Sequence, residues 1–343
     1  MHFEPNTLPS GAVLSNPGGA APGKREQGMR FIFNPCSGRR RNARLLPAVR
    51  ALIAGRPLNA DLMITDGPGH ATELARQAVA RGCARVVAVG GDGTMNEVAQ
   101  ALINTNTSLA MVPCGSGNGL ARHLGLPGTS DEAMALAANL GASIATIDTG
   151  SVNGHPFFNA MGLGLDAEVS RRFNALTRRG LPAYARTALS VFLGRRSERC
   201  VITCDGTSQS IEALLISVAN SDQYGNGAFV APGATVDDGL LDLVAVQPTG
   251  AFRAAALGVR LFLGSFDRSP RVHRLRGGYF VIERPSAGIV HTDGEIHQTG
   301  ALLTIEIRPR SLSVVVSEAF ATSGRKARPP SAGIGRLPFA LNL

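Results

Sequence analysis

Short apolar runs alternate with amphipathic stretches between residue 30 and about residue 150. A short apolar run is typical of a buried strand, and apolar residues at every third or fourth position are typical of a helix. Regular alternation of strands and helices predicts a parallel sheet with crossover helices. The predicted strands are 30–33, 60–65, 85–89 and 109–112, and the helices that follow them are 41–54, 70–81, 95–103 and 118–124.

Strand patterns dominate from about residue 150 onward. Turn pairs such as Asp205-Gly206 and Asp238-Gly239 separate the apolar runs, which predicts a β-rich second domain. Helical patterns interrupt it at 166–176, 184–193 and 251–263. The predicted strands are 201–204, 211–219, 241–246, 271–275, 279–283, 302–307 and 312–316.

The two ends of the chain lack such periodicity. Residues 1–28 hold four prolines and five glycines and are predicted to be a disordered arm, with Met29 as a candidate natural start. Residues 323–343 are rich in proline and arginine and are predicted to be a tail. The most apolar helical pattern, 133–147, is too short to cross a membrane, and no window reaches about 18 apolar residues.

Composition narrows the class of protein. A length of 343 residues suggests two domains, and 44% hydrophobic residues exclude wholesale disorder. The net charge of +9 favours phosphates, nucleic acid or anionic lipid, although 32 of the 34 basic residues are arginine, which also suggests a GC-rich coding sequence. Five cysteines without metal-ligand spacing predict reduced thiols, and the first residues lack the order of a signal peptide. A cytoplasmic protein is therefore expected.

The strongest functional signal is the segment from Val87 to Glu97, Val-Ala-Val-Gly-Gly-Asp-Gly-Thr-Met-Asn-Glu. Three glycines between a buried strand and a helix let the backbone turn tightly and approach a ligand. The unpaired N–H groups at the start of the helix favour phosphate. Thr94 adds a hydroxyl donor, and the Asp92 carboxylate could hold Mg²⁺ or accept a proton. The alternative is an ordinary tight turn in which Asp92 caps the helix.

Two more polar loops follow the first and fourth predicted strands. They read Asn34-Pro35-Cys36-Ser37-Gly38 and Pro113-Cys114-Gly115-Ser116-Gly117-Asn118. Because the carboxyl ends of parallel strands meet at one edge of a sheet, the three loops together predict a cradle for a nucleoside triphosphate. The cradle is neither a P-loop nor a dinucleotide fingerprint, since both glycine patterns are absent.

A fourth signal, His291-Thr292-Asp293-Gly294-Glu295, lies far along the chain. It is either a hairpin turn with solvated acids or a second supply of carboxylates to a cleft between the domains. In the cleft, Asp293 or Glu295 could deprotonate a hydroxyl nucleophile. The pair Asp237-Asp238 before a glycine is an unremarkable turn, or it binds a hard cation together with neighbouring carbonyl groups.

The motifs at 34–38, 90–97, 113–118 and 293–295 together resemble those of the diacylglycerol kinase catalytic-domain family. This superfamily includes bacterial lipid kinases, sphingosine kinases and ceramide kinases. The resemblance is ordered and covers residues 30–316. The Gly-Gly-Asp-Gly-Thr loop alone is shared with NAD kinases and phosphofructokinases, so the combination of motifs carries the resemblance.

The resemblance implies an α/β plus β fold. An α/β ATP-binding domain similar to NAD kinase would span 29–150 and regain residues 309–322 from the end of the chain. A β-sandwich-like lipid-substrate domain would span 151–308. The active site would lie in the cleft between the two domains.

The resemblance also implies roles for individual residues. Glu295 would be the proton acceptor with Asp293 supporting it, although Asp92 is a second candidate for the base. The Asp238 carboxylate and the carbonyl groups of Thr235 and Leu240 would hold a structural Mg²⁺. The ATP site would be lined by Asn34, Cys36, Ser37, Gly38, Arg39, Arg40, Thr65, Gly91, Asp92, Gly93, Thr94, Met95, Asn96, Glu97, Ser116 and Asn118.

The expected reaction transfers the γ-phosphate of ATP to a primary hydroxyl group of a membrane lipid. The lipid is diacylglycerol, or a sphingoid base or ceramide. Gly119 stands where bacterial members commonly have aspartate, and the third loop is similar to that of sphingosine-kinase-like members, so both acceptors stay open. The alternatives are an NAD kinase-like small-molecule kinase and a non-catalytic lipid or nucleotide sensor of the same fold.

A basic amphipathic stretch suggests how the protein reaches a lipid. Eight arginines between residues 171 and 199 are interleaved with apolar residues, a pattern suited to an anionic membrane surface. The alternative is two ordinary surface helices. We therefore expect peripheral association with the inner membrane face, and a homodimer is possible. Nucleic acid is not an expected partner, because aromatic residues make up only 5% of the chain and no nucleic-acid module is present.

Overall fold

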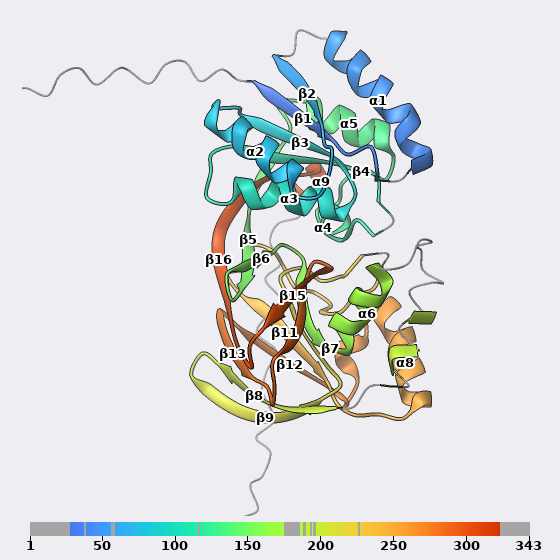
Figure 1. Ribbon diagram of the computed structural model, residues 1–343, viewed down its shortest axis with the longest axis vertical. Helices are drawn as coiled ribbons and strands as arrows, with labels where there is room; N and C mark the ends of the chain where they lie inside the picture. Colours follow the sequence, from blue (N-terminus) through green and yellow to red (C-terminus); the bar gives the residue numbers. More distant parts are fainter. Residues whose placement is uncertain are drawn as a thin grey trace, which may run out of the picture.

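The computed structural model describes residues 28–37, 39–55, 59–115, 117–174, 186–187, 190–192, 194, 197–225 and 227–322. The predicted arm up to residue 27, the predicted tail, Gly38, Ser116 and half of the predicted helix 184–193 lie outside this part of the chain. Figure 1 shows two domains, one above the other, with β5 (Ile144–Val152) and β16 (Leu302–Val315) passing between them.

The first domain is a parallel sheet between two layers of helices. Its strands follow the order β2-β1-β3-β4, all parallel. Their bounds are β1 Met29–Phe33, β2 Ala60–Ile64, β3 Arg85–Gly90 and β4 Ser108–Pro113. The helices are α1 Arg39–Ala54, α2 His70–Ala80, α3 Asp92–Leu102, α4 Gly119–His123, α5 Ser130–Ala138 and, near the end of the described chain, α9 Glu318–Thr322.

Both faces of this sheet are covered, which explains its continuous apolar strands. Val86 and Ala88 of β3 pack in one core with α2 and α3, while Val87 and Val89 pack in a second core with α1 and α5. Side chains along a strand alternate between the faces, so a strand buried on both sides is apolar at most positions. The buried Arg30 and Arg85 are exceptions near the start of their strands.

The second domain is a sandwich of two sheets. One sheet has the order β12-β11-β10-β7-β14-β15, and the other contains β16-β13-β8-β9. Apolar side chains from both sheets form a single core between them. The elements are β6 His155–Phe157, β7 Ala160–Gly164, α6 Leu165–Asn174, β8 Glu198–Cys204, β9 Thr207–Ala213, β10 Leu215–Ala219, β11 Leu241–Val246, α8 Ala251–Phe262, the 3-10 turn Phe266–Arg268, β12 Val272–Gly277, β13 Tyr279–Glu283, β14 Gly288–Thr292 and β15 Glu295–Thr299.

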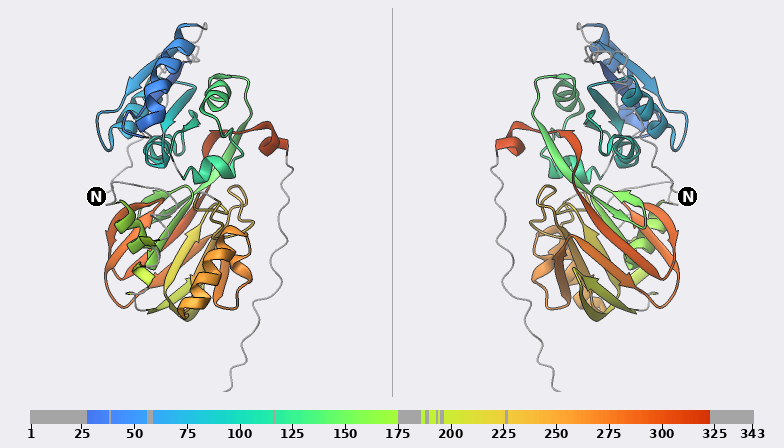
Figure 2. Two further views of the ribbon diagram at one scale, coloured as in Figure 1. Left: turned by 90° about the vertical axis from the view of Figure 1, so that its right-hand side faces the viewer. Right: turned by 90° about the vertical axis from the view of Figure 1, so that its left-hand side faces the viewer.

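Strand β16 belongs to both domains. Its first half pairs with β13 of the sandwich, and near its end Val314 pairs in parallel with Leu109 of β4. The first domain's sheet and one sheet of the second are therefore a single ten-stranded sheet. Figure 2 shows this strand curving from one domain to the other.

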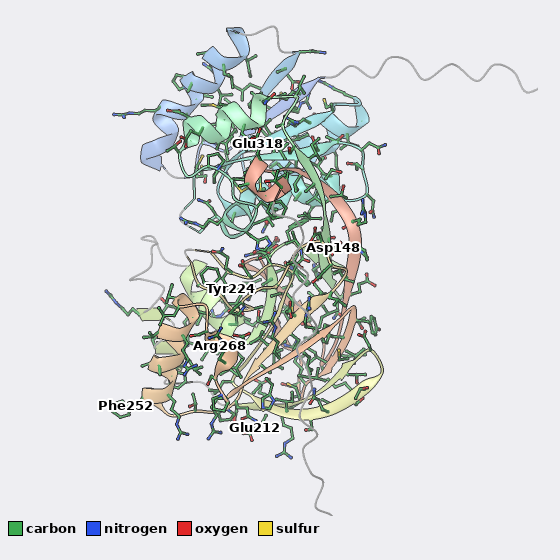
Figure 3. The ribbon with its side chains drawn as sticks, turned by 180° about the vertical axis from the view of Figure 1, so that it is seen from behind. Asp148, Glu212, Tyr224, Phe252, Arg268 and Glu318 are labelled. Carbon is green, nitrogen blue, oxygen red and sulfur yellow. The ribbon has the colours of Figure 1, made fainter. Side chains whose placement is uncertain are left out.

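Asp148 of β5 fixes the bend in β16. The pairing of β16 with β5 shifts register between Arg308 and Leu312, and Arg310 adopts a left-handed conformation with φ 51°. The buried Asp148 carboxylate accepts the Arg310 N–H at 2.7 Å and the Gly239 N–H at 2.8 Å. Burial raises the pKa of Asp148, and the two amide hydrogen bonds oppose this shift. Figure 3 labels Asp148 where β5 passes between the domains.

Three sequence predictions need correction. The pattern 133–147 is not one helix: α5 ends at Ala138 and strand β5 begins at Ile144. The predicted strand 211–219 is two strands, because the chain passes from one sheet to the other at Leu214. The predicted strands 302–307 and 312–316 are the two halves of the bent strand β16.

No helix in the described ranges is long and apolar enough to cross a membrane.

Candidate active site

The three glycine-containing loops meet at the carboxyl edge of the first domain's sheet. Asn34, after β1, donates from its side-chain amide to the Thr94 hydroxyl at 2.8 Å. A Cβ atom placed on Gly91 would lie 2.9 Å from the Ser37 hydroxyl and 3.4 Å from the Gly115 Cα. The loops after β1, β3 and β4 therefore touch one another, and glycine at position 91 is what allows the close approach.

Asp92 is the first residue of α3, and its carboxylate binds the loop after β4. Its two oxygens accept the Asn118 N–H at 3.0 Å and the Gly119 N–H at 3.1 Å. Asn118 has a left-handed backbone with φ 51°, and its side chain is buried. Asp92 thus caps the start of α4 and ties the second loop to the third.

The other residues predicted to line the ATP site fall into two groups. Some are structural: the Met95 side chain is in the hydrophobic core, the Glu97 carboxylate accepts the Ala71 N–H at the start of α2, and Thr65 is buried at the end of β2. Others lie at the loop edge: Cys36 and Gly93 are exposed, and Ser37 and Asn96 are half-buried. Gly38 and Ser116 lie outside the described residues, and α1 begins at Arg39 with the side chains of Arg39 and Arg40 also undescribed.

Gly119 packs directly against the second domain. A Cβ atom on Gly119 would lie 2.5 Å from the Asn159 side-chain nitrogen and 2.8 Å from the Tyr224 carbonyl oxygen. A second contact nearby joins His123 of α4 to Asp222, with 2.8 Å between His123 Nδ1 and the carboxylate. The absence of a side chain at position 119 thus has a packing reason at the domain junction.

Asp293 and Gly294 form the turn between β14 and β15. Both have positive φ, 50° and 91°, as in the two-residue turns preferred by hairpins. The Asp293 carboxylate is not solvated, because it accepts three N–H groups: Phe158 at 2.7 Å, Ala160 at 2.8 Å and Asn159 at 2.9 Å. Burial raises the pKa of Asp293 to about 6, although the three amide hydrogen bonds act in the opposite direction.

Glu295 differs from both aspartates. It is the first residue of β15, its side chain is exposed, and it makes no hydrogen bond or ion pair with a described residue. Its neighbours include His297, which stacks on His155 with 4.0 Å between the ring centroids. Burial and the charge of His155 lower the pKa of His297, while Glu295 raises it.

A buried polar cluster beneath the hairpin was missed by sequence reasoning. Asp166 accepts the Tyr224 hydroxyl at 2.5 Å and lies 3.1 Å from His291 Nε2. The Gly294 N–H donates to His291 Nδ1 at 3.3 Å. Of Asp166, Tyr224 and His291, only His291 lies in one of the sequence motifs described above. Asp166 begins an ordinary helix pattern and Tyr224 follows a strand, so no spacing signal joins them.

The Asp238 carboxylate, predicted to hold a structural Mg²⁺ with the carbonyl groups of Thr235 and Leu240, has protein partners at both oxygens. One carboxylate oxygen accepts the Thr235 hydroxyl at 2.7 Å and pairs with the Arg276 guanidinium, and the other accepts the Leu240 N–H at 3.0 Å. The Arg276 guanidinium therefore balances the charge of this carboxylate. Among the described residues, no group of three or more histidines, cysteines, aspartates and glutamates is placed to hold a metal ion.

Known structures share this arrangement of domains. The chain aligns with a crystal structure of a diacylglycerol kinase from Bacillus anthracis str. Sterne with a TM-score of 0.68, 23% identity, and coverage of 86% of this chain and 98% of that one. It aligns with an NAD kinase from Archaeoglobus fulgidus in complex with ATP with a TM-score of 0.51, 15% identity, and coverage of 85% and 95%. The chain therefore shares the two-domain, NAD kinase-like fold of these structures, as the sequence predicted.

Sequence comparison narrows this class. Residues 28–154 match the diacylglycerol kinase catalytic domain, and residues 159–316 match the YegS C-terminal NAD kinase beta sandwich-like domain. A probable lipid kinase YegS-like of Pseudomonas aeruginosa (strain UCBPP-PA14) is 34% identical over 76% of this chain and 85% of its own. A diacylglycerol kinase of Bacillus subtilis is 29% identical over 67% and 78%. The chain therefore belongs to the diacylglycerol kinase catalytic-domain family, and the protein is a kinase. The resemblance found in the sequence is thereby confirmed.

Proposed function

We propose that the protein transfers the γ-phosphate of ATP to the primary hydroxyl group of diacylglycerol. One observation carries the proposal. The cradle of three loops and the Asp293–Glu295 hairpin meet at one junction, where Gly119 of the first domain contacts Asn159 of the second. Backbone amides suited to phosphate and an exposed carboxylate are thereby brought to the same place.

The cradle would hold the nucleotide mainly by its backbone. The start of α3, with the glycines at 91 and 93, presents N–H groups and the positive end of a helix dipole to the phosphates. The hydrogen bond from Asn34 to Thr94 fixes the first loop against the second, so the amides are positioned before the nucleotide arrives. Catalysis of phosphoryl transfer depends mostly on such positioning and on charge neutralisation.

We assign the proton acceptor to Glu295. The carboxylates of Asp92 and Asp293 already accept two and three backbone N–H groups, so each holds a loop in place. Glu295 is exposed and has no such partner among the described residues. It would take the proton of the lipid hydroxyl as that oxygen bonds to the γ-phosphorus and ADP leaves.

Diacylglycerol is favoured over a sphingoid base or ceramide for two reasons. Relatives over most of the chain bear the name diacylglycerol kinase. The sequence argument for a sphingoid acceptor rested on Gly119 and on the form of the third loop, and the glycine has a packing role against Asn159 and Tyr224. Magnesium would enter as the counter-ion of the nucleotide substrate.

The test is a transfer assay with γ-labelled ATP and Mg²⁺. The acceptors are mixed micelles that contain diacylglycerol, sphingosine or ceramide, with NAD as a soluble acceptor in a parallel reaction. We expect label in phosphatidic acid alone. Label in a sphingolipid would overturn the acceptor, and label in NAD alone would support the NAD kinase-like alternative. Intact ATP binding with no transfer to any acceptor would favour a sensor.

A further inference from the structure

Helix α8 lies on the outer face of the sandwich and carries the most exposed apolar residues of the described chain. It packs inward through Leu257, which joins the core beneath it. Outward lie Phe252, Val259, Phe262 and, just after the helix, Leu263, with 95%, 60%, 42% and 72% of their surface exposed. Figure 3 shows Phe252 at the outer edge of the second domain, pointing away from it. Single exposed apolar residues are common, but a group of four is a patch that indicates a partner.

Helical spacing places these residues on one side. Phe252 and Val259 are seven positions apart, and Phe262 and Leu263 follow Val259 at three and four positions. Residues with these spacings share a helix face, and this face is turned away from Leu257. The exposed alanines Ala255 and Ala256 lie between them, so the face is apolar along the whole helix.

Arginines flank the apolar face. Arg253 and Arg260, also seven positions apart, line an open pocket of about 470 Å³ together with Arg271. The side chains of these three arginines make no hydrogen bond or ion pair with any residue in the described ranges. The chain has no aspartate or glutamate between Asp242 and Asp267, so no carboxylate on α8 neutralises them. Three unneutralised guanidinium groups around one pocket suit a phosphate group.

We propose that α8 is a docking surface for a bilayer that contains anionic phospholipid. The apolar face enters the boundary between headgroups and acyl chains, and Arg253, Arg260 and Arg271 bind a lipid phosphate in the adjoining pocket. The combination of a cationic pocket and an apolar face distinguishes a bilayer from a soluble anion, which would use only the pocket. The surface deepens the proposed function by giving the kinase a route to a membrane substrate.

The first test is sedimentation of the full-length protein with vesicles, which requires neither ATP nor turnover. We expect binding to vesicles of phosphatidylcholine and phosphatidylglycerol at 7:3 and little binding to phosphatidylcholine alone. The variant R253Q/R260Q should bind the mixed vesicles about 10- to 30-fold more weakly, given the usual contribution of an arginine near an anionic surface. The variant F252S/L263S should lose binding by a similar factor. The matched controls R50Q/R76Q and L140S/L302S change exposed residues elsewhere and should bind as the wild type does.

The second test uses fluorescence. The chain has no tryptophan, so F252W introduces a single reporter on the proposed surface, and Y279W places one on an exposed strand of the sandwich as a control. Mixed vesicles should shift the emission of F252W to the blue and leave Y279W unchanged. A blue shift that depends on protein concentration without vesicles would overturn the proposal in favour of a second copy of this chain. Equal shifts of both reporters, or none, would also overturn it.

The outcomes separate this proposal from the proposed function. If the kinase assay fails but vesicle binding follows the α8 variants, the docking surface stands and the function does not. If the α8 variants retain activity on a water-soluble, short-chain diacylglycerol and lose it on vesicles, both stand. If they bind vesicles as the wild type does, the docking proposal fails whatever the activity.

Discussion

Asp92 and Asp293 hold opposite sides of the domain junction by the same means. The Asp92 carboxylate accepts the Gly119 N–H at 3.1 Å, and the Asp293 carboxylate accepts the Asn159 N–H at 2.9 Å. Gly119 and Asn159 in turn contact each other. Two acids that the motifs mark as catalytic candidates therefore position backbone segments, which is why we propose Glu295 as the proton acceptor.

Glu295→Gln should abolish transfer without affecting the fold. We expect kcat to fall about 100- to 10,000-fold, the usual contribution of a general base. The temperature of unfolding should not change, because the Glu295 side chain is exposed. Glu283→Gln, at an exposed position of β13, is the matched control and should keep full activity. Full activity of Glu295→Gln would remove the assignment of the proton acceptor.

Unlike Glu295→Gln, Asp293→Asn should mainly lower the stability of the fold. An amide side chain cannot accept three N–H groups as a carboxylate does, so the buried amides of Phe158, Asn159 and Ala160 lose partners. We expect the free energy of unfolding to fall by roughly 3 kcal/mol, at the upper end for an unsatisfied buried group. Asp92→Asn, which disturbs two amides, should cost less. Urea denaturation measures both, and wild-type stability of Asp293→Asn would contradict this role.

Gly119→Ala should weaken the domain junction and leave the choice of lipid unchanged. The added methyl group would collide with Asn159 and the Tyr224 carbonyl, at a cost of about 1–3 kcal/mol for overpacking. Gly128→Ala has open space and an ordinary φ, so it serves as the control. The ratio of rates on diacylglycerol and sphingosine would be compared in the two variants. If the wild type preferred sphingosine, and Gly119→Ala lost this preference while Gly128→Ala kept it, the result would show that Gly119 selects the lipid.

The protein should lose stability below about pH 6.5 through His297. Burial and the charge of His155 lower the pKa of His297 below its unfolded value of 6.5. The unfolded chain therefore takes up a proton at a pH where the folded protein does not, and stability falls as the pH drops through this window. His297→Gln can still bond to Thr292 but cannot titrate. Its denaturation midpoint should fall less between pH 7 and 5 than that of the wild type or of His273→Gln, and equal falls would count against the shift.

The first domain could be predicted almost completely from the sequence, because its strands are buried on both faces. The runs at 86–89 and 109–112 are uniformly apolar, and helical periodicity follows each of them. Strand β5 escaped prediction because Asp148 interrupts its apolar run, and this aspartate is buried only by virtue of its bonds to Gly239 and Arg310. Local pattern cannot reveal a polar residue whose partners are distant in the chain.

The sequence indicated which residues belong to the candidate site, but only part of what their side chains do. The loops at 34–38, 90–97 and 113–118 can each be recognised from their own glycines and polar residues. Their meeting at one sheet edge was predicted because each follows a strand of a parallel sheet. The role of Asp293 depends on three amides more than 130 residues away, and the packing of Gly119 depends on Asn159. Both required the arrangement of the two domains.

The route of β16 has a consequence for biosynthesis. Leu109 and Val314 are neighbours in one sheet, yet the ribosome adds about 200 residues between them. At about 5–20 residues per second, the edge of β4 waits roughly 10–40 seconds for its neighbour after it has been made. The nascent first domain therefore stays incomplete until β16 has left the ribosome. The protein has two domains in its architecture but matures as one unit.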